Sequence, residues 1–315
     1  MIIVTGGAGF IGSNLVRGLN RSGIEEVVVV DDLTDGHKFS NIVDCAVHDY
    51  WDKDSLLEEL RSGRRPKPDA VFHQGACAVT TEWNGRFMME TNYRYSVDLL
   101  EYCLAERVPF IYASSAAVYG ASDAFDEGDP ALERPLNVYG YSKLLFDRYV
   151  RRALPAAKSQ IVGLRYFNVY GPGEAHKGAM ASVAYHLHRQ LEQGGELCLF
   201  EASDGYAPGE QRRDFVYIDD VVRVNCWLLQ NPAVSGVFNV GTGASASFNQ
   251  LASAVIAWHG RGAIRYIPFP EALRSSYQSF TEANIGALRA AGYRGSFVDI
   301  DAGAAAYLDA LRDRS

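Results

Sequence analysis

The chain has 315 residues, of which 48% are hydrophobic and 22% are charged, and its formal net charge is -8 at pH 7. This composition excludes a disordered or fibrous protein, and an acidic chain without clustered Lys and Arg gives no electrostatic basis for binding nucleic acid or an anionic membrane. No apolar run reaches the roughly 18 residues that a membrane helix needs, and the start at Met1 has no signal-peptide pattern, so we expect a cytoplasmic protein with no membrane partner.

Short β-branched runs alternate with helical patterns through the first half of the chain. This alternation predicts βαβ units and a parallel sheet, and the continuously apolar runs are typical of strands covered on both faces. The predicted strands are 2–5, 27–30, 70–72, 110–113 and 160–165, and the predicted helices are 11–20, 55–60, 92–106 and 139–153.

The pattern changes after Gly171-Pro172, where a polar, glycine-rich loop at 202–211 interrupts mixed strands and helices. The predicted strands there are 197–200, 215–217, 237–240 and 264–267, and the predicted helices are 181–192, 219–229, 248–258 and 285–291. We therefore expect an α/β chain with a Rossmann-type doubly wound parallel sheet in residues 1–170. Residues 171–315 would form mainly a smaller, interleaved C-terminal α/β substrate lobe, with 213–243 returning to the first domain.

Glycines at Gly6, Gly9 and Gly12 follow the first predicted strand and open the first predicted helix, which continues through Phe10 and Ile11. Glycine permits a tight turn and a close backbone approach, while a helix N-terminus offers free N–H groups to a pyrophosphate. The strand, turn and helix together predict a dinucleotide site.

Two acids, Asp31 and Asp32, end the second predicted strand, near the distance expected for a carboxylate on the adenosine ribose. Asp31 alone favours NAD. Lys38 and Lys53 follow, and a lysine here pairs with a 2′-phosphate in NADP or is a solvated surface residue. We predict NADP, with NAD as the alternative.

A Y-x-x-x-K pattern, Tyr139 to Lys143, starts the helical segment at 139–153 and places both side chains on one helical face. A free tyrosine has a pKa of about 10, and an adjacent ammonium and an oxidised nicotinamide ring should lower it toward neutrality. Ser115, just after the strand at 110–113, can hydrogen-bond the reacting hydroxyl. These residues predict a redox site that moves a proton and a hydride.

The chain resembles the extended short-chain dehydrogenase/reductase family and, within it, the nucleotide-sugar epimerases. The supporting strings are Thr5 to Gly12, Asn92, Ser114 to Gly120, Tyr139 to Lys143, Arg213 to Tyr217 and Asn239 to Gly243. More narrowly, the chain is similar to the ADP-L-glycero-D-manno-heptose 6-epimerase family in Thr80 to Trp83, Pro135 to Lys143, Arg165 to Pro172, His176 to Gly178 and Ala181 to Ala184.

This resemblance implies an isomerase that inverts C6 of ADP-heptose through a 6-keto sugar, for lipopolysaccharide inner-core heptose supply. It implies one tightly bound NADP per subunit and a homo-oligomer such as a pentamer. It assigns further cofactor contacts to Gln74, Gly75, Ala76, Cys77, Ala78, Asn92, Lys143, Val169 and Lys177, and substrate contacts to Asn168, Ala179, His186, Phe200, Glu201, Ala202, Ser203, Arg213 and Tyr277.

Two of these positions have alternative explanations from their chemistry alone. The resemblance gives Lys177 a second proton-transfer role, but a lysine in this polar loop could equally hold a phosphate or face solvent. A guanidinium at Arg213 suits a diphosphate, and an ion pair with Asp214 is the alternative. The chain also departs from the family pattern, since Gln74 replaces an acid, Ala179 replaces a serine, and the loop at 204–211 is longer than usual.

Other functions remain open from the sequence. A UDP-hexose 4-epimerase would share Ser115, Tyr139 and Lys143. A sugar 4,6-dehydratase is disfavoured, because Ala116 and Ala117 stand where an acid pair is needed. A dinucleotide sensor without catalysis is the alternative from another class of protein. Five widely spaced cysteines form no C-x-x-C pair, so we predict reduced thiols and no metal site.

Overall fold

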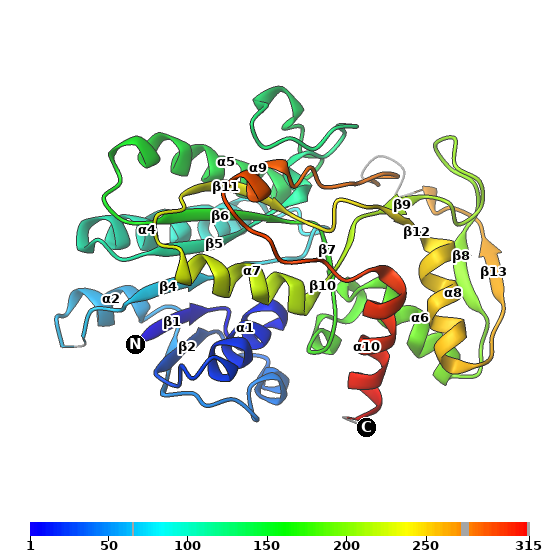
Figure 1. Cartoon of the computed structure of the whole chain (residues 1–315), viewed down its shortest axis with the longest axis horizontal. Helices are drawn as coiled ribbons and strands as arrows, with labels where there is room; N and C mark the ends of the chain where they lie inside the picture. Colours follow the sequence, from blue (N-terminus) through cyan, green and yellow to red (C-terminus); the bar gives the residue numbers. More distant parts are fainter. Residues whose placement is uncertain (65, 272–276, 314–315) are drawn as a thin grey trace.

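The computed structural model describes residues 1–64, 66–271 and 277–313. A seven-stranded parallel sheet lies at its centre, in the order β11-β6-β5-β4-β1-β2-β3 (Figure 1). Its strands are β1 Ile2–Thr5, β2 Val27–Asp31, β3 Asp49–Asp52, β4 Ala70–His73, β5 Phe110–Ser115, β6 Ile161–Tyr166 and β11 Gly236–Val240. Strands β1 to β6 lie in the Rossmann order β3-β2-β1-β4-β5-β6, and β11 is added outside β6. The predicted doubly wound parallel sheet is confirmed.

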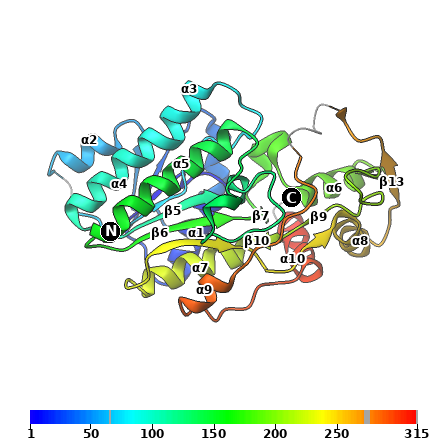
Figure 2. The same ribbon diagram turned by 90° about the horizontal axis from the view of Figure 1, so that it is seen from above.

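Helices cover both faces of this sheet, as its apolar strands require (Figure 2). Side chains alternate along β2, so Val27 and Val29 pack with α1 and α7, while Val28 and Val30 pack with α2, α4 and α5. These helices are α1 Phe10–Arg21, α2 Leu56–Arg61, α4 Tyr95–Glu106, α5 Val138–Ala153 and α7 Ile218–Gln230. None of the helices in the described part of the chain is long and apolar enough to cross a membrane.

The segment predicted as one helix at 92–106 is divided in the structure. The short α3, Gly85–Met88, leads into a π-helical turn at Met89–Arg94, and regular α4 begins only at Tyr95. Wide turns of this kind often occur beside functional sites. Here the turn contains Asn92, which is buried.

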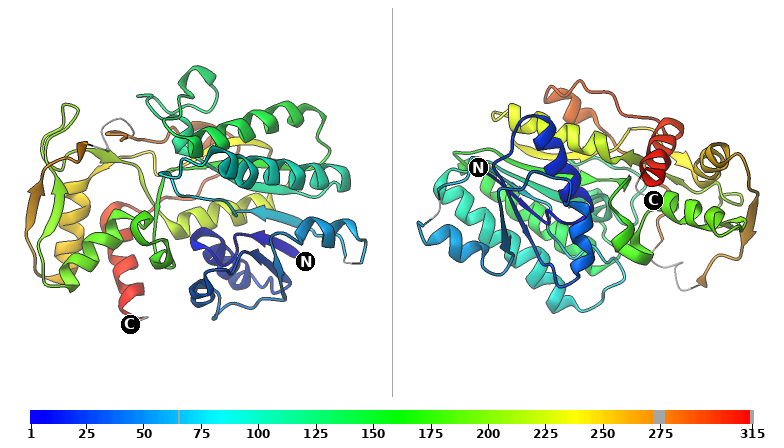
Figure 3. Two further views of the ribbon diagram at one scale, coloured as in Figure 1. Left: turned by 180° about the vertical axis from the view of Figure 1, so that it is seen from behind. Right: turned by 90° about the horizontal axis from the view of Figure 1, so that it is seen from below.

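A smaller group of elements lies beyond the carboxyl ends of the central strands (Figure 3). It contains the parallel pair β8 and β13, the short pairs β7 with β10 and β9 with β12, and helices α6, α8 and α10. The bounds are β7 Asn168–Tyr170, α6 Val183–Glu192, β8 Leu197–Phe200, β9 Arg212–Arg213, β10 Phe215–Tyr217, β12 Ala246–Ser247, α8 Phe248–His259, β13 Ile264–Ile267 and α10 Ile300–Arg312. Helix α9, Gly286–Ala290, packs instead against β11 of the main sheet.

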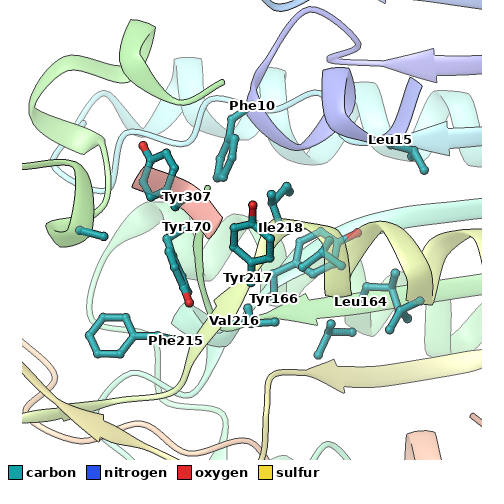
Figure 4. Close-up of a cluster of buried hydrophobic side chains, with 14 of the residues drawn as sticks. Phe10, Leu15, Leu164, Tyr166, Tyr170, Phe215, Val216, Tyr217, Ile218 and Tyr307 are labelled. Carbon is teal, nitrogen blue, oxygen red and sulfur yellow. The ribbon is translucent and has the colours of Figure 1, made fainter. Parts of the chain in front are cut away.

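Aromatic side chains join this group to the sheet. Tyr170 of β7 contacts Phe215, Tyr217 and Tyr307, with ring centroids 6.5, 5.6 and 6.3 Å apart. Figure 4 shows these rings with Phe10 of α1 in one buried cluster. The first turn of α1 and the late helix α10 therefore share a core.

Candidate functional site

A cavity of about 620 Å³ opens where the central strands end and the smaller group begins. Its floor includes Ser115 at the end of β5 and the segment after β6, and its far wall includes α6, β8 and β9. Open α/β sheets bind ligands outside the carboxyl ends of their strands, which is where this cavity lies.

The glycine turn forms one end of this region, and its three glycines meet different surroundings. Gly6 has φ +64°, and a Cβ there would lie 2.6 Å from the Gly75 Cα. At Gly12 a Cβ would lie 2.1 Å from the Gly6 carbonyl oxygen. At Gly9 a Cβ would lie 3.1 Å from the same oxygen, and the next atom, the Gly6 carbonyl carbon, is 4.0 Å away. No side chain caps α1, so its first N–H groups are free for an anion.

Acidic and basic side chains meet at the end of β2. The Asp31 carboxylate accepts the Ala8 backbone N–H at 2.8 Å and lies 2.6 Å from the Lys38 ammonium. Lys38 is largely buried, with 16% of its side chain exposed, which excludes a freely solvated surface lysine. Lys53 is more exposed and lies 2.7 Å from Asp54 and 3.8 Å from Asp32.

The loop after β4 borders the cavity at Gln74, Ala76 and Ala78. Asn92 holds this loop, because its amide donates to the Cys77 carbonyl at 2.9 Å and accepts the Cys77 N–H at 2.8 Å. Both polar atoms of the Gln74 amide are buried without a hydrogen-bonding partner among the described residues. Buried amides normally have partners, so this part of the cavity fits a polar cofactor group.

Ser115, Tyr139 and Lys143 line the cavity together. Helix α5 begins where Asn137 accepts the Gly140 N–H at 2.8 Å, and this cap fixes the turn that carries Tyr139. One turn later, the Lys143 ammonium donates to the Ala113 carbonyl of β5 at 2.9 Å. The structure thus brings the three predicted reaction residues to one place.

Burial dominates the electrostatics of these residues. It lowers the pKa of Lys143 to about 8, against the opposing effect of the Asp147 carboxylate. It also raises the pKa of Tyr139 above its usual value, and a hydrogen bond with Ser115 opposes that rise. The sequence-based expectation was a lowered Tyr139 pKa, and the protein alone does not produce it, because desolvation of the phenolate outweighs its neighbours.

Lys177 enters the cavity wall from the turn at Ala175–Met180. Its ammonium lies 5.2 Å from the centre of the Phe10 ring and 3.9 Å from the Glu174 carboxylate. Burial lowers the Lys177 pKa, and Glu174 opposes that effect. The side chain lines the cavity, and its lowered pKa makes the ammonium a better proton donor than a solvent-exposed lysine.

Arg213 lies on the opposite wall, nearly buried between aromatic rings. Its guanidinium carbon is 4.7 Å from the centre of the Tyr277 ring and 5.7 Å from that of Phe248. Asp214 instead accepts backbone N–H groups of Thr242, Gly243 and Ala283.

The structure therefore does not show the alternative Arg213–Asp214 ion pair, because the Asp214 carboxylate is engaged by these backbone N–H groups. Among the described residues, the contacts of the Arg213 guanidinium are the Arg212 carbonyl and the rings of Phe248 and Tyr277, with no carboxylate within salt-bridge distance. A buried guanidinium remains charged, so this wall of the cavity favours an anionic ligand.

The remaining predicted substrate residues divide into two groups. Asn168, His186 and Phe200 line the cavity with Arg213 and Tyr277. Ala179, Glu201, Ala202 and Ser203 lie outside its lining.

Ser203 is buried beside the cavity and accepts a hydrogen bond from Gln211 at 2.9 Å. Gln211 itself lines the cavity, as do Met180, Phe248, Gln278 and Thr281, none of which the sequence patterns singled out. These residues belong to no local motif, because the chain fold alone brings them together.

The model of the NAD dependent epimerase/dehydratase family matches residues 2–241. The ADP-L-glycero-D-manno-heptose-6-epimerase of Alkalilimnicola ehrlichii is 58% identical over 314 residues, which cover 99% of this chain and 98% of that protein.

Two solved structures show the same architecture. The ADP-L-glycero-D-manno-heptose-6-epimerase of Helicobacter pylori superposes with a TM-score of 0.84 at 34% identity, covering 99% of this chain and 96% of that one. The UDP-glucose 4-epimerase of Thermus thermophilus, solved in complex with NAD, gives a TM-score of 0.81 at 28% identity, covering 100% and 99%.

Proposed function

This chain belongs to the NAD dependent epimerase/dehydratase family, and we propose that it interconverts ADP-D-glycero-D-manno-heptose and ADP-L-glycero-D-manno-heptose by inverting C6. The observation that carries the proposal is the 58% identity, over nearly its full length, to a heptose 6-epimerase. The cavity supports it, since Ser115, Tyr139 and Lys143 lie opposite Arg213. The product would supply inner-core heptose for lipopolysaccharide.

The chemistry of C6 determines what the residues must do. The C–H bond of a carbinol carbon is not acidic, so inversion requires temporary oxidation to a 6-keto sugar. Tyr139 takes the proton of the C6 hydroxyl, Ser115 hydrogen-bonds the same oxygen, and the Lys143 ammonium favours the tyrosinate. A bound nicotinamide supplies reversible hydride acceptance and, when oxidised, a positive charge that favours the tyrosinate.

Two epimers present their C6 hydroxyl differently, and one base does not reach both positions equally. We propose Lys177 as the second proton-transfer residue. Its ammonium is in the cavity wall beside Phe10, and burial lowers its pKa, which favours release of a proton to the substrate oxygen. On the other wall, Arg213 would hold the diphosphate of the ADP moiety.

The cofactor we propose is NADP, held by the glycine turn, the Asn92-supported loop at 74–78, and Lys38 and Lys53. Lys38 neutralises the Asp31 carboxylate, so a 2′-phosphate would meet a balanced pair rather than a bare negative charge. The choice of cofactor is tested by denaturing the purified protein and identifying the released nucleotide by mass spectrometry. NADP is expected, and NAD alone would contradict the proposal.

The substrate is tested by incubating the purified enzyme with ADP-glyceromanno-heptose and following the C6 configuration by NMR. Interconversion is expected without added reductant, because the reaction is redox-neutral. Turnover of UDP-galactose without heptose turnover would instead support a UDP-hexose 4-epimerase. Retention of the dinucleotide with no turnover of either sugar would support a sensor.

The predicted homo-oligomer can be measured by light scattering.

Replacing Tyr139 with Phe tests the proposed base. Tyr139→Phe should lower kcat by at least about 100-fold, since general-base catalysis contributes roughly 10² to 10⁴. The amount of bound dinucleotide should stay unchanged. Tyr141→Phe is the matched control, because Tyr141 is 45% exposed and lies outside the cavity lining. Full activity in Tyr139→Phe would refute the assignment.

A further inference from the structure

Behind the reaction residues lies a buried carboxylate, Asp147, which the proposed mechanism does not use. Tyr139, Lys143 and Asp147 follow one another at four-residue spacing on α5, so they lie on one face of the helix. Asp147 has no exposed surface. It therefore forms the inner end of a row whose outer end is in the cavity.

The contacts of Asp147 reach both strands that end at the cavity. Tyr112 and Ser114 of β5 donate their hydroxyls to Asp147 at 2.9 and 3.0 Å, and Arg165 of β6 donates its Nε at 2.9 Å. Ser114 precedes Ser115, and the Lys143 ammonium contacts the Ala113 carbonyl on the same strand. A single carboxylate thus joins the helix of Tyr139 to the strand of Ser115.

Most other charged groups near this row are already balanced by a partner. Arg165 also donates to Glu133 at 2.5 Å, and Glu133 lies 2.6 Å from Arg151. His73 of β4, which interacts with Lys143, stays neutral because burial lowers its pKa to about 3. The Cys77 thiol is the other titratable group that raises the pKa of Lys143, and Tyr139 lies one helical turn away on the same helix. This leaves Asp147 as the chief negative charge that opposes desolvation of Lys143.

We propose that Asp147 is a positioning residue for the epimerisation, which fixes α5 against the strand of Ser115 and supplies the buried negative charge that keeps Lys143 an ammonium. The inference rests on the proposed function only for its activity assay. Buried ion pairs do not guarantee stability, but they do set the charge state of their neighbours. Removal of this charge should move the pH range in which the enzyme works.

Asp147→Asn tests the role, with Tyr112→Phe as the matched control that removes one hydrogen bond to Asp147 and keeps the charge. Without the carboxylate, Lys143 loses its proton at lower pH. The high-pH limb of the kcat profile should therefore move down by about one pH unit or more, while the rate near pH 6 changes less. Tyr112→Phe should keep the wild-type profile. An unshifted profile in Asp147→Asn, or an equal shift in Tyr112→Phe, would overturn the proposal.

A second measurement separates this inference from the choice of substrate. Acetic anhydride labels only the unprotonated amine, so the labelling of Lys143 across pH, read by peptide mass spectrometry, reports its charge. The labelling midpoint should fall in Asp147→Asn even if the heptose is not the substrate, and an unchanged midpoint refutes the role. If Asp147→Asn does not fold, the double variant Asp147→Asn/Arg165→Gln leaves no unpaired guanidinium, and its midpoint should also fall below that of wild type.

Discussion

Two of the three evenly spaced glycines in the glycine turn, Gly9 and Gly12, perform different tasks. Gly12 is required by the turn itself, because its α-carbon packs against the Gly6 carbonyl. Gly9 is the N-cap residue of α1, and a Cβ there would make one close contact, with the Gly6 carbonyl oxygen at 3.1 Å. Its missing side chain matters for what binds there rather than for how the chain folds.

Alanine substitutions should separate these two tasks. Gly9→Ala should fold with a melting temperature near that of wild type but lose most of its bound dinucleotide, since the new methyl group occupies the pyrophosphate position. Gly12→Ala should fail to fold or melt far lower, because its Cβ would lie 2.1 Å from a backbone oxygen. Thermal unfolding and nucleotide content of the purified variants measure both effects. Full nucleotide content in Gly9→Ala would refute the proposed site.

Residue-level prediction from the sequence worked where spacing along the chain decides the arrangement. Tyr139 and Lys143 are one helical turn apart, so their proximity in the cavity needed no knowledge of the fold. The lowered pKa of Tyr139 stays a prediction for the enzyme with its cofactor bound, because burial raises this pKa in the protein alone. The sequence also left the contacts of Arg213 undecided, because Tyr277 and Phe248 are far from it along the chain.

Helices α6 and α8 meet through a pair of histidines. His188 of α6 and His259 of α8 form a hydrogen bond between ring nitrogens at 3.0 Å, with Glu192 3.4 Å from His188. Burial lowers the pKa of both imidazoles, and at His259 the neighbouring His188 and Arg261 lower it further. The contact therefore requires at least one neutral ring.

The sign of the resulting pH dependence follows from these directions. A histidine with a lowered folded pKa binds fewer protons than in the unfolded chain, so its contribution to stability is complete above about pH 6.5 and is lost as the pH falls below that value. Urea unfolding should show a lower midpoint at pH 5 than at pH 7.5, and His259→Gln should reduce that difference. The exposed His37→Gln is the control. An unchanged difference in His259→Gln would contradict the assignment.

Among the elements, the sequence patterns predicted the strands rich in β-branched and aromatic residues and missed β3, β7, β9 and β12. β3 at Asp49–Asp52 is an edge strand with polar ends, and β9 and β12 have only two residues each. Helix α10 was missed although it is regular, because its apolar side alternates with small residues and depends on packing against α8. Such elements are defined by their neighbours rather than by their own periodicity.

At the scale of the whole molecule, Asp214 joins segments that are far apart in the chain. Its carboxylate accepts N–H groups of Thr242, Gly243 and Ala283 at 2.7, 3.0 and 2.9 Å. Asp214 lies between β9 and β10, so these bonds connect both strands with the segment after β11 and the segment before α9. The cavity wall is thereby attached to the main sheet.

Asp214→Asn should weaken the whole fold. The amide offers one acceptor and brings its own donors toward three backbone N–H groups, and leaving such buried groups unpaired costs about 2 to 3 kcal/mol of unfolding free energy. Urea denaturation at pH 7.5 measures the loss. Asp123→Asn, at an exposed loop position, should change stability by less than about 0.5 kcal/mol. Equal stability of the two variants would contradict the role of Asp214.

The position of β11 in the sheet bears on how the protein is made. Strand β6 pairs on its outer side with β11, yet α6, β8 and the loop at 202–211 lie between them in the chain. During translation, β6 leaves the ribosome well before its outer neighbour has been synthesised, so a nascent chain that ends near residue 170 has an unprotected apolar edge. Gene fragments cut at that point should therefore aggregate rather than yield an isolated nucleotide-binding unit.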